Sequence, residues 1–353
     1  MTRPARVIFD AGAVRANLQV VKARAPGRRI MAIVKADAYG HGVVRMAHAL
    51  DDVDALGVAS IEEAVRLREA GIAGRIVLLE GPFDRQELPE IAIHRLESVV
   101  HTQEQVRMFA AHPDPIALWI KVDTGMHRLG FAPAEVADVV NALGRTDRTL
   151  RLMTHFASAH LVDDPSVAAQ AEAFRRVDGG GDFERCCANS SAIIAWPATH
   201  AEWIRPGLML YGVSPLADVS AQALGLRPAM TVASALIAVK RVAAGGAVGY
   251  GRGFVCPEDM DIGVVAFGYA DGYPRHAATG TPVLVNGVRT QVIGEASMDM
   301  MAVDLRPVGG ARAGDPVVLW GDGLPVEDIA RAAGTIPYEL LCRMRMRAQF
   351  VER

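Results

Sequence analysis

Eight short apolar runs alternate with helix-like segments between residues 30 and 211, and this alternation most constrains the fold. Each run is bounded by glycine, proline or polar residues, which is typical of parallel strands buried on both faces. The runs are Ile30–Ala36, Ala55–Ser60, Ile76–Glu80, Ser98–Thr102, Ile116–Asp123, Arg151–Phe156, Phe183–Asn189 and Trp203–Leu210. Eight such strands predict an α/β fold, a (β/α)8 barrel of the TIM type. A doubly wound open sheet is the alternative, although no GxGxxG turn follows the first run.

Three of the intervening segments carry helix start signals. Ser60 and Glu63 can form a capping box, and Thr102 and Gln105 repeat that spacing. Asp164-Pro165 provides an N-cap followed by proline at the first helical position. These signals support helices after the second, fourth and sixth predicted strands.

After about residue 226 the pattern becomes mostly β. The strand-like runs are Thr231–Arg241, Ile262–Gly268, Pro282–Val285, Val288–Val292, Met298–Leu305 and Pro316–Trp320. Asn286-Gly287 between two of them is a strong hairpin signal. Only Val326–Ala333 has a helical pattern. We therefore predict a barrel domain at 1–225 and a C-terminal, mostly β domain at 226–353.

Composition narrows the possible partners and the compartment. The net charge of −3 gives no electrostatic reason to expect nucleic acid or a membrane surface. No stretch reaches the roughly 20 apolar residues that span a bilayer, and the start, MTRPARVIFDAG, lacks a signal-peptide core. The cysteines show neither a CxxC pair nor a zinc spacing, so we expect free thiols, no metal and a cytoplasmic protein. They are Cys186, Cys187, Cys256 and Cys342.

Lys35 ends the first predicted barrel strand, where barrel enzymes place catalytic groups. Its apolar neighbours Ile33 and Val34 make it a candidate nucleophile toward carbonyl compounds. Taken alone, a lysine at a strand end is more often a surface or ion-pair residue.

The residues around Lys35 change this balance, because Val34–Gly42 resembles the cofactor-lysine signature of the alanine racemases. Further matches to that family follow in order over nearly the full length. They are Lys121–Gly130, Thr154–Ala157, Asn189-Ser190, Arg205–Gly212, Val248–Gly251, Gly268–Arg275 and Ser297–Asp299. The resemblance implies a pyridoxal-phosphate enzyme that interconverts L-alanine and D-alanine, supplying or consuming D-alanine.

By this resemblance, Lys35 carries pyridoxal 5'-phosphate. The family pattern places the phosphate at residues after the seventh and eighth strands, the usual phosphate site of a barrel. Those residues are Asn189, Ser190, Gly207 and Leu208, with Tyr39 adding a hydroxyl. Arg205 resembles the arginine that faces the pyridine nitrogen, and His155 the histidine packed against the ring and bonded to that arginine. Taken without the family context, they are a structural ion pair and a core histidine.

The resemblance also assigns the substrate side of the site. Arg128 matches the arginine near the cofactor's phenolic oxygen and the substrate carboxylate, and Lys121 a lysine that is often carbamylated in the family. Met298 and Asp299 match the carboxylate-binding motif, which comes from the partner subunit.

Racemisation needs two acid–base groups on opposite faces of a planar carbanion. Lys35 is one of them, and the resemblance assigns it the proton of the D-enantiomer. Tyr250 matches the other, which acts on the L-enantiomer and comes from the partner's β domain. The resemblance therefore implies a homodimer. A packed aromatic in a Gly-Tyr-Gly turn is the alternative for Tyr250.

Three positions depart from the family's substrate entrance. Glu295 replaces an arginine, His160 an aspartate and Met346 a tyrosine, while Tyr269 and Arg275 of the same entrance are retained. A flexible thioether in place of an aromatic ring is expected to enlarge the pocket.

Three other functions stay open on the sequence alone. A racemase of broader specificity, acting on serine as well, fits the Met346 departure. A non-catalytic pyridoxal-phosphate carrier would use the same barrel without residues 226–353. A metal-dependent D-amino-acid aldolase or dehydratase would need a metal cluster in the β domain, where Cys256 has no nearby histidine.

Overall fold

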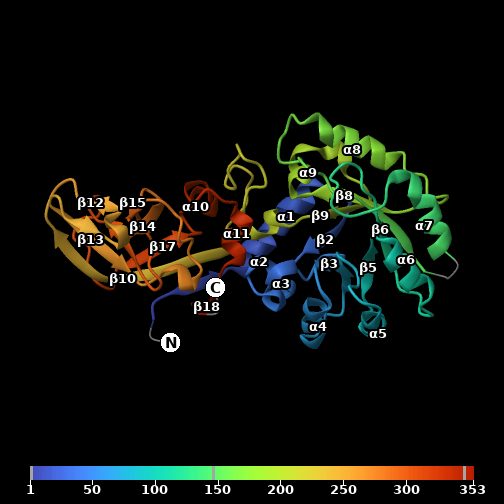
Figure 1. The fold of residues 1–353 in the computed structure, drawn as a ribbon, viewed down its shortest axis with the longest axis horizontal. Coiled ribbons are helices and arrows are strands. Elements are labelled where there is room, and N and C mark those ends of the chain that lie inside the picture. Colours follow the sequence, from blue (N-terminus) through green and yellow to red (C-terminus); the bar gives the residue numbers. More distant parts are fainter. Residues whose placement is uncertain (1–2, 145–147, 345–346) are drawn as a thin grey trace.

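The computed structural model describes residues 3–144, 148–344 and 347–353. It confirms the predicted architecture, a closed barrel of eight parallel strands followed by a mostly β domain (Figure 1). The barrel strands are β2 (Arg29–Ile33), β3 (Ala55–Val58), β4 (Arg75–Leu78), β5 (Glu97–Val100), β6 (Leu118–Lys121), β7 (Leu150–Met153), β8 (Arg185–Asn189) and β9 (Trp203–Arg205). Seven of the eight strands end before their predicted last residue, because the chain there leaves the sheet to form the loops at the barrel's C-terminal mouth.

Helices surround the barrel and connect its strands. They are α1 (Ala11–Arg24), α2 (Lys35–Tyr39), α3 (Val43–Ala49), α4 (Ile61–Glu69), α5 (Leu88–Ile93), α6 (Gln103–Ala110), α7 (Val136–Leu143), α8 (Pro165–Arg175) and α9 (Ser190–Ala195). Short 3-10 turns add η1 (Arg85–Glu87), η2 (Pro133–Glu135), η3 (Pro197–Thr199) and η4 (Leu208–Tyr211). No helix in the three described ranges is long and apolar enough to cross a membrane.

The predicted helix starts are confirmed with one difference. The Ser60 side chain accepts a hydrogen bond from Glu63 N at 3.5 Å, and Thr102 caps its helix in the same way. The Glu63 carboxylate reaches back to Ala59 N at 2.9 Å, one residue before the N-cap. This carboxylate oxygen thereby accepts from a backbone N–H just outside the helix. The other oxygen accepts from Asp37 N, in the segment that follows Lys35.

The second domain is built on an eight-stranded sheet of order β13-β16-β15-β14-β17-β10-β1-β18, in which β1 is Arg6–Phe9 and the other seven strands follow the barrel in the chain. Its chain-order elements are β10 (Met230–Val242), β13 (Met260–Val265), β14 (Pro282–Val285), β15 (Val288–Ile293), β16 (Met301–Asp304), β17 (Pro316–Trp320) and β18 (Gln349–Glu352), with α10 (Val326–Ala332) and α11 (Pro337–Cys342). A small hairpin, β11 (Ala247–Val248) and β12 (Phe254–Val255), and two turns, η5 (Tyr250–Arg252) and η6 (Tyr269–Asp271), complete it. The prediction of a single helix here was wrong, because α11 follows α10.

Both ends of the chain lie in this sheet. The strand β1 (Arg6–Phe9) pairs antiparallel with β10 and parallel with β18. The sequence pattern did not predict a strand at Arg6–Phe9. The domain division at residue 225 remains a prediction, and β1 crosses it by pairing with the second domain.

Helix α11 packs against the segment that follows Lys35, and Figure 1 shows α11 beside α2. Gly40 makes this approach possible: a Cβ there would lie 2.2 Å from the Leu341 carbonyl oxygen, and its φ of 75° also favours glycine. The second domain therefore covers part of the barrel's C-terminal mouth.

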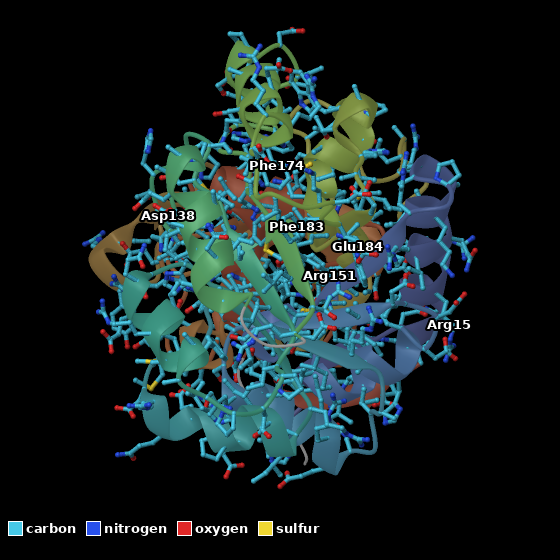
Figure 2. The ribbon with its side chains drawn as sticks, turned by 90° about the vertical axis from the view of Figure 1, so that its right-hand side faces the viewer. Arg15, Asp138, Arg151, Phe174, Phe183 and Glu184 are labelled. Atoms are coloured by element: carbon cyan, nitrogen blue, oxygen red, sulfur yellow. The ribbon has the colours of Figure 1, made fainter. Side chains whose placement is uncertain are left out.

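An ion-pair network closes the opposite, N-terminal end of the barrel. Arg151 on β7 contacts Glu184 through Nε at 2.7 Å and Glu97 through Nη1 at 3.2 Å. Figure 2 shows Arg151 and Glu184 side by side. Trp203 and Trp119 donate their indole N–H groups to Glu184 and Glu97. Burial alone would raise the pKa of Glu184, but these hydrogen bonds and the arginines lower it to about 2.

Candidate active site

A cavity of about 640 Å³ opens at the C-terminal ends of the barrel strands. Its wall carries four basic side chains: Lys35, Lys121, Arg128 and Arg205. Two carboxylates, Glu80 and Asp123, stand against them. This excess of basic groups in a concave site suits a ligand that brings anionic groups, such as a phosphate and a carboxylate.

Lys35 starts an unusual stretch of backbone. The next four residues, Ala36–Tyr39, all have positive φ, between 48° and 55°. A left-handed turn of residues with side chains costs about 1–2 kcal/mol per residue, so surrounding contacts must hold it.

Contacts from two sides hold this turn. Glu63 on α4 accepts a hydrogen bond from Asp37 N at 3.0 Å. The buried His41 ring places Nδ1 at 2.9 Å from the Tyr39 carbonyl oxygen and 3.1 Å from that of Ala38. Because both partners are acceptors, Nδ1 carries the hydrogen and donates it. The turn fixes where the side chains of Lys35 and Tyr39 enter the cavity.

Tyr39 lies over Gly207. A Cβ at Gly207 would lie only 2.8 Å from the Tyr39 hydroxyl oxygen, so this contact needs glycine. The Tyr39 ring stacks on Tyr211 at 4.6 Å, and Tyr211 donates its hydroxyl to the Ile33 carbonyl at 2.8 Å. Burial raises the pKa of Tyr39 above its usual value. Its hydroxyl therefore stays protonated and can donate to an anion.

Ser190 and Gly207 meet at the exits of β8 and β9. Ser190 Oγ accepts a hydrogen bond from Gly207 N at 2.9 Å. Asn189 caps α9 by accepting from Ala192 N at 3.0 Å. Leu208 starts η4 and has a buried side chain. The hydroxyls of Ser190 and Tyr39 and the backbone N–H of Gly207 are thus gathered at one end of the cavity.

Arg205 is held rigidly on the barrel wall. Its side chain is buried and donates to the carbonyl oxygens of Thr154 at 2.6 Å and Cys186 at 2.9 Å. Nη2 also lies 3.2 Å from His155 Nδ1. Burial, and then the charges of Arg205 and Lys121, lower the pKa of His155 well below 6.5. The predicted pair of Arg205 and His155 is present, with a neutral imidazole that accepts from the guanidinium.

Lys121 ends β6 and lines the same cavity as Arg128. Burial, followed by the charges of Arg205 and Arg128, lowers the pKa of Lys121 to about 7. A large share of this amine is therefore neutral near physiological pH, and a neutral amine is a nucleophile.

Tyr250, Met298 and Asp299 lie in the second domain and do not line this cavity. Tyr250 is 71% exposed and Met298 is 53% exposed. The Asp299 carboxylate pairs with Arg347. Within one chain, the structure therefore does not bring Tyr250 to Lys35.

The predicted entrance residues come from both domains. Arg275 and Glu295 of the second domain form a salt bridge of 2.8 Å, and Tyr269 of that domain is partly exposed. His160 is exposed on the barrel after β7. Met346 lies outside the described residues.

Several cavity residues were absent from the predicted set, and two of them come from the second domain. Tyr338 and Cys342 of α11 both line the cavity, and the Tyr338 ring lies 5.4 Å from that of Tyr39. Pro337, at the first position of α11, was the available signal for this helix.

Comparison with known proteins gives one answer along the whole chain. The family models described as "Alanine racemase, N-terminal domain" and "Alanine racemase, C-terminal domain" match residues 9–215 and 229–352. The alanine racemase of Nitrosomonas europaea is 50% identical, with 99% of each chain covered. That of Nitrosospira multiformis is 48% identical, covering 99% of this chain and all of the relative.

Solved structures agree with these matches. The biosynthetic alanine racemase of Pseudomonas aeruginosa superposes with a TM-score of 0.95 at 44% identity, and both chains are fully covered. The alanine racemase of Bartonella henselae, solved with covalently bound pyridoxal phosphate, superposes with a TM-score of 0.91 at 26% identity over 99% of each chain.

Proposed function

This chain belongs to the alanine racemase family, and on that premise we propose that it interconverts L- and D-alanine with Lys35 and Tyr250 as its two bases. The main support is the arrangement of the cavity. Lys35, the Arg205–His155 pair and the hydroxyls of Tyr39 and Ser190 all line it at the C-terminal end of the barrel.

The cavity fits pyridoxal 5'-phosphate. Lys35 would hold its carbonyl carbon, while the hydroxyls of Tyr39 and Ser190 would donate to its phosphate. The N–H of Gly207 orients the Ser190 hydroxyl by donating to its oxygen, and Asn189 and Leu208 belong to the same two loops. Glycine at 207 leaves the space that this approach needs. When bound, the cofactor supplies an electron sink for the carbanion at the substrate's α-carbon.

Arg205 limits how strong that sink becomes. A guanidinium cannot give up its proton, and five acceptor atoms hold this one in place. Arg205 would donate to the ring nitrogen of the cofactor without protonating it, which would weaken the electron sink that the cofactor supplies. A weaker sink would suit racemisation better than transamination.

Lys35 and Tyr250 would remove and return the α-proton from opposite faces. Tyr250 is largely exposed on the second domain, away from the cavity of its own chain. We therefore infer a homodimer in which each Tyr250 enters the cavity of the other subunit.

Arg128, Lys121 and the Met298-Asp299 loop would bind the substrate carboxylate. Because burial and nearby cations lower the pKa of Lys121 to about 7, its neutral amine can add CO2 and release a proton to solvent, which forms an anionic carbamate. That anion would pair with Arg128 and offset the excess of positive charge in the cavity.

A mixture of two inactive variants tests the shared site. Lys35→Ala chains retain Tyr250, and Tyr250→Phe chains retain Lys35, so each mixed dimer holds one intact site of two. Random exchange should restore up to about one quarter of wild-type activity, because half of the dimers are mixed. Differently tagged subunits allow the mixed dimer to be purified. An inactive purified mixed dimer would contradict the proposal.

A further inference from the structure

Two arginines from opposite ends of the chain meet two aspartates of the second domain. Arg3 Nη2 donates to Asp271 Oδ2 at 2.7 Å and to the Asp299 carbonyl oxygen at 2.5 Å. Arg347 pairs with the Asp299 carboxylate, and its Nε lies 3.6 Å from Asp271 Oδ1. We call these four residues the Asp271 network.

Asp271 is the centre of this network. Its side chain is 0% exposed, whereas those of Arg347 and Asp299 are 40% and 41% exposed. Asp271 Oδ2 also accepts a hydrogen bond from Gly268 N at 2.9 Å. A fully buried carboxylate with cations on both sides fixes its surroundings more firmly than an exposed pair does.

The network joins two loops that are themselves interlocked. Tyr269 N donates to the Ser297 carbonyl and Ala270 N to the Met298 carbonyl, both at 3.0 Å. The two loops pack closely at Gly268, where a Cβ would lie only 2.4 Å from the Met298 carbonyl oxygen. The loops 268–271 and 297–300 are therefore joined as one packed unit.

This unit carries exposed residues on its outer side. Tyr269 is 38% exposed, Met298 53% and Met300 42%, in a domain whose core is otherwise well packed. Under the proposed function, Tyr269 and Met298 face the cavity of the partner subunit.

We propose that Asp271, held by Arg3 and Arg347, is a positioning residue that sets the Tyr269 and Met298 loops for substrate binding in the partner subunit's site. This inference rests on the shared site of the proposed function. Asp271 touches neither substrate nor cofactor and acts through the backbone of these loops.

Mixed dimers separate this role from simple stabilisation of the domain. In a dimer of Lys35→Ala and Tyr250→Phe chains, the intact site takes its loops from the Lys35→Ala chain. Asp271→Asn on that chain should raise KM for alanine at least about tenfold, since small misplacements of binding groups are costly. The same substitution on the Tyr250→Phe chain faces the dead site and should leave KM within about twofold of the parent.

Asp304→Asn is the matched control. Asp304 is buried in the same domain and pairs with Arg306 at 2.7 Å, outside the Asp271 network. It should change thermal stability without any dependence of KM on which chain carries it.

Equal KM in both placements of Asp271→Asn would overturn the inference. The mixed dimer of Lys35→Ala and Tyr250→Phe chains is assayed first, before any Asp271 variant is made. If that dimer is inactive, the proposed shared site is wrong, and this result is distinct from a failure of the Asp271 inference. If Asp271→Asn does not fold, Arg347→Gln in the same two placements decides, because that side chain is partly exposed. It should show the same one-chain effect on KM, and its absence would overturn the inference.

Discussion

Arg205 Nη2 lies 3.2 Å from His155 Nδ1, and this contact fixes the tautomer of the His155 ring. A guanidinium only donates, so Nδ1 must present its lone pair and any ring hydrogen must sit on Nε2. Burial and the neighbouring cations already favour a neutral ring. The charge that faces the centre of the cavity therefore belongs to the arginine.

Arg205→Gln should raise the pKa of His155 while leaving it below 6.5. Burial, the largest cause of the shift, remains in the variant, but the strongest nearby charge is lost. NMR titration of the imidazole in both proteins measures this. A wild-type ring that titrates at its ordinary pKa would contradict the assignment.

Gly207→Ala should weaken pyridoxal 5'-phosphate binding by about tenfold or more, equivalent to at least ~1.4 kcal/mol. The added methyl would lie 2.8 Å from the Tyr39 hydroxyl oxygen, so the ring must move from the phosphate end. Gly74→Ala is the control, since nothing lies within 4 Å of its Cβ position. Fluorescence titration of the apoproteins gives the dissociation constant of pyridoxal 5'-phosphate for each variant. Equal values for Gly207→Ala and Gly74→Ala would contradict the phosphate site proposed beside Gly207.

Lys121 should take up CO2, visible as a carbamate signal in ¹³C NMR with labelled bicarbonate and lost in Lys121→Met. Its folded pKa of about 7 lies below the usual 10.5. Below about pH 7 the unmodified lysine is charged in the folded protein, and its burial then lowers the free energy of unfolding by the largest amount. This effect decreases to zero as the pH rises from about 7 to about 10.5. Bicarbonate should accordingly raise Tm near pH 8 in the wild type alone. A signal that persists in the variant would belong to another amine.

Arg151→Met should destabilise the barrel by about 1.5–3 kcal/mol, the scale of a hydrogen bond to a charged group, because Glu97 and Glu184 lose their shared cation and keep only Arg75 and Arg29. Arg176→Ala, which removes an exposed pair with Glu172, should cost at most about 1 kcal/mol. Urea unfolding at neutral pH compares the two variants.

The same network predicts the wild type's acid sensitivity. The pKa of Glu184 is depressed from 4.5 to about 2, so its contribution is present above about pH 4.5 and is lost as the pH falls toward about 2. In Arg151→Met the folded pKa of Glu184 should rise toward 4.5, so the loss of stability should be smaller and should be complete at a higher pH than in the wild type. Identical acid profiles would exclude Glu184 as a contributor.

The sequence predicts the barrel well because each strand is local, apolar and followed by its own helix. It does not predict β1, whose four residues gain a strand's hydrogen bonds only from β10 and β18, far along the chain. Motifs place Lys35, His155 and Arg205 in one site. They do not predict the left-handed turn at Ala36–Tyr39, because none of these four residues is a glycine. Gly40, which follows them, is the first residue of a type that favours positive φ.

The Asp271 network could not be predicted from the sequence either. Arg3 and Arg347 stand at opposite ends of the chain, and each appears in sequence as an ordinary surface arginine. Tyr250 is the reverse case, since its motif suggests a role that the geometry of a single chain does not display.

Solvent-deuterium exchange in Tyr250→Phe tests the two-base account most directly. Racemisation should fall by roughly 100-fold or more, the scale of one general acid–base group, while the cofactor stays bound. Exchange should become one-sided: deuterium still enters D-alanine through Lys35 but enters L-alanine poorly. Equal loss of exchange from both enantiomers would contradict the account, because Tyr250 would then act as a structural residue.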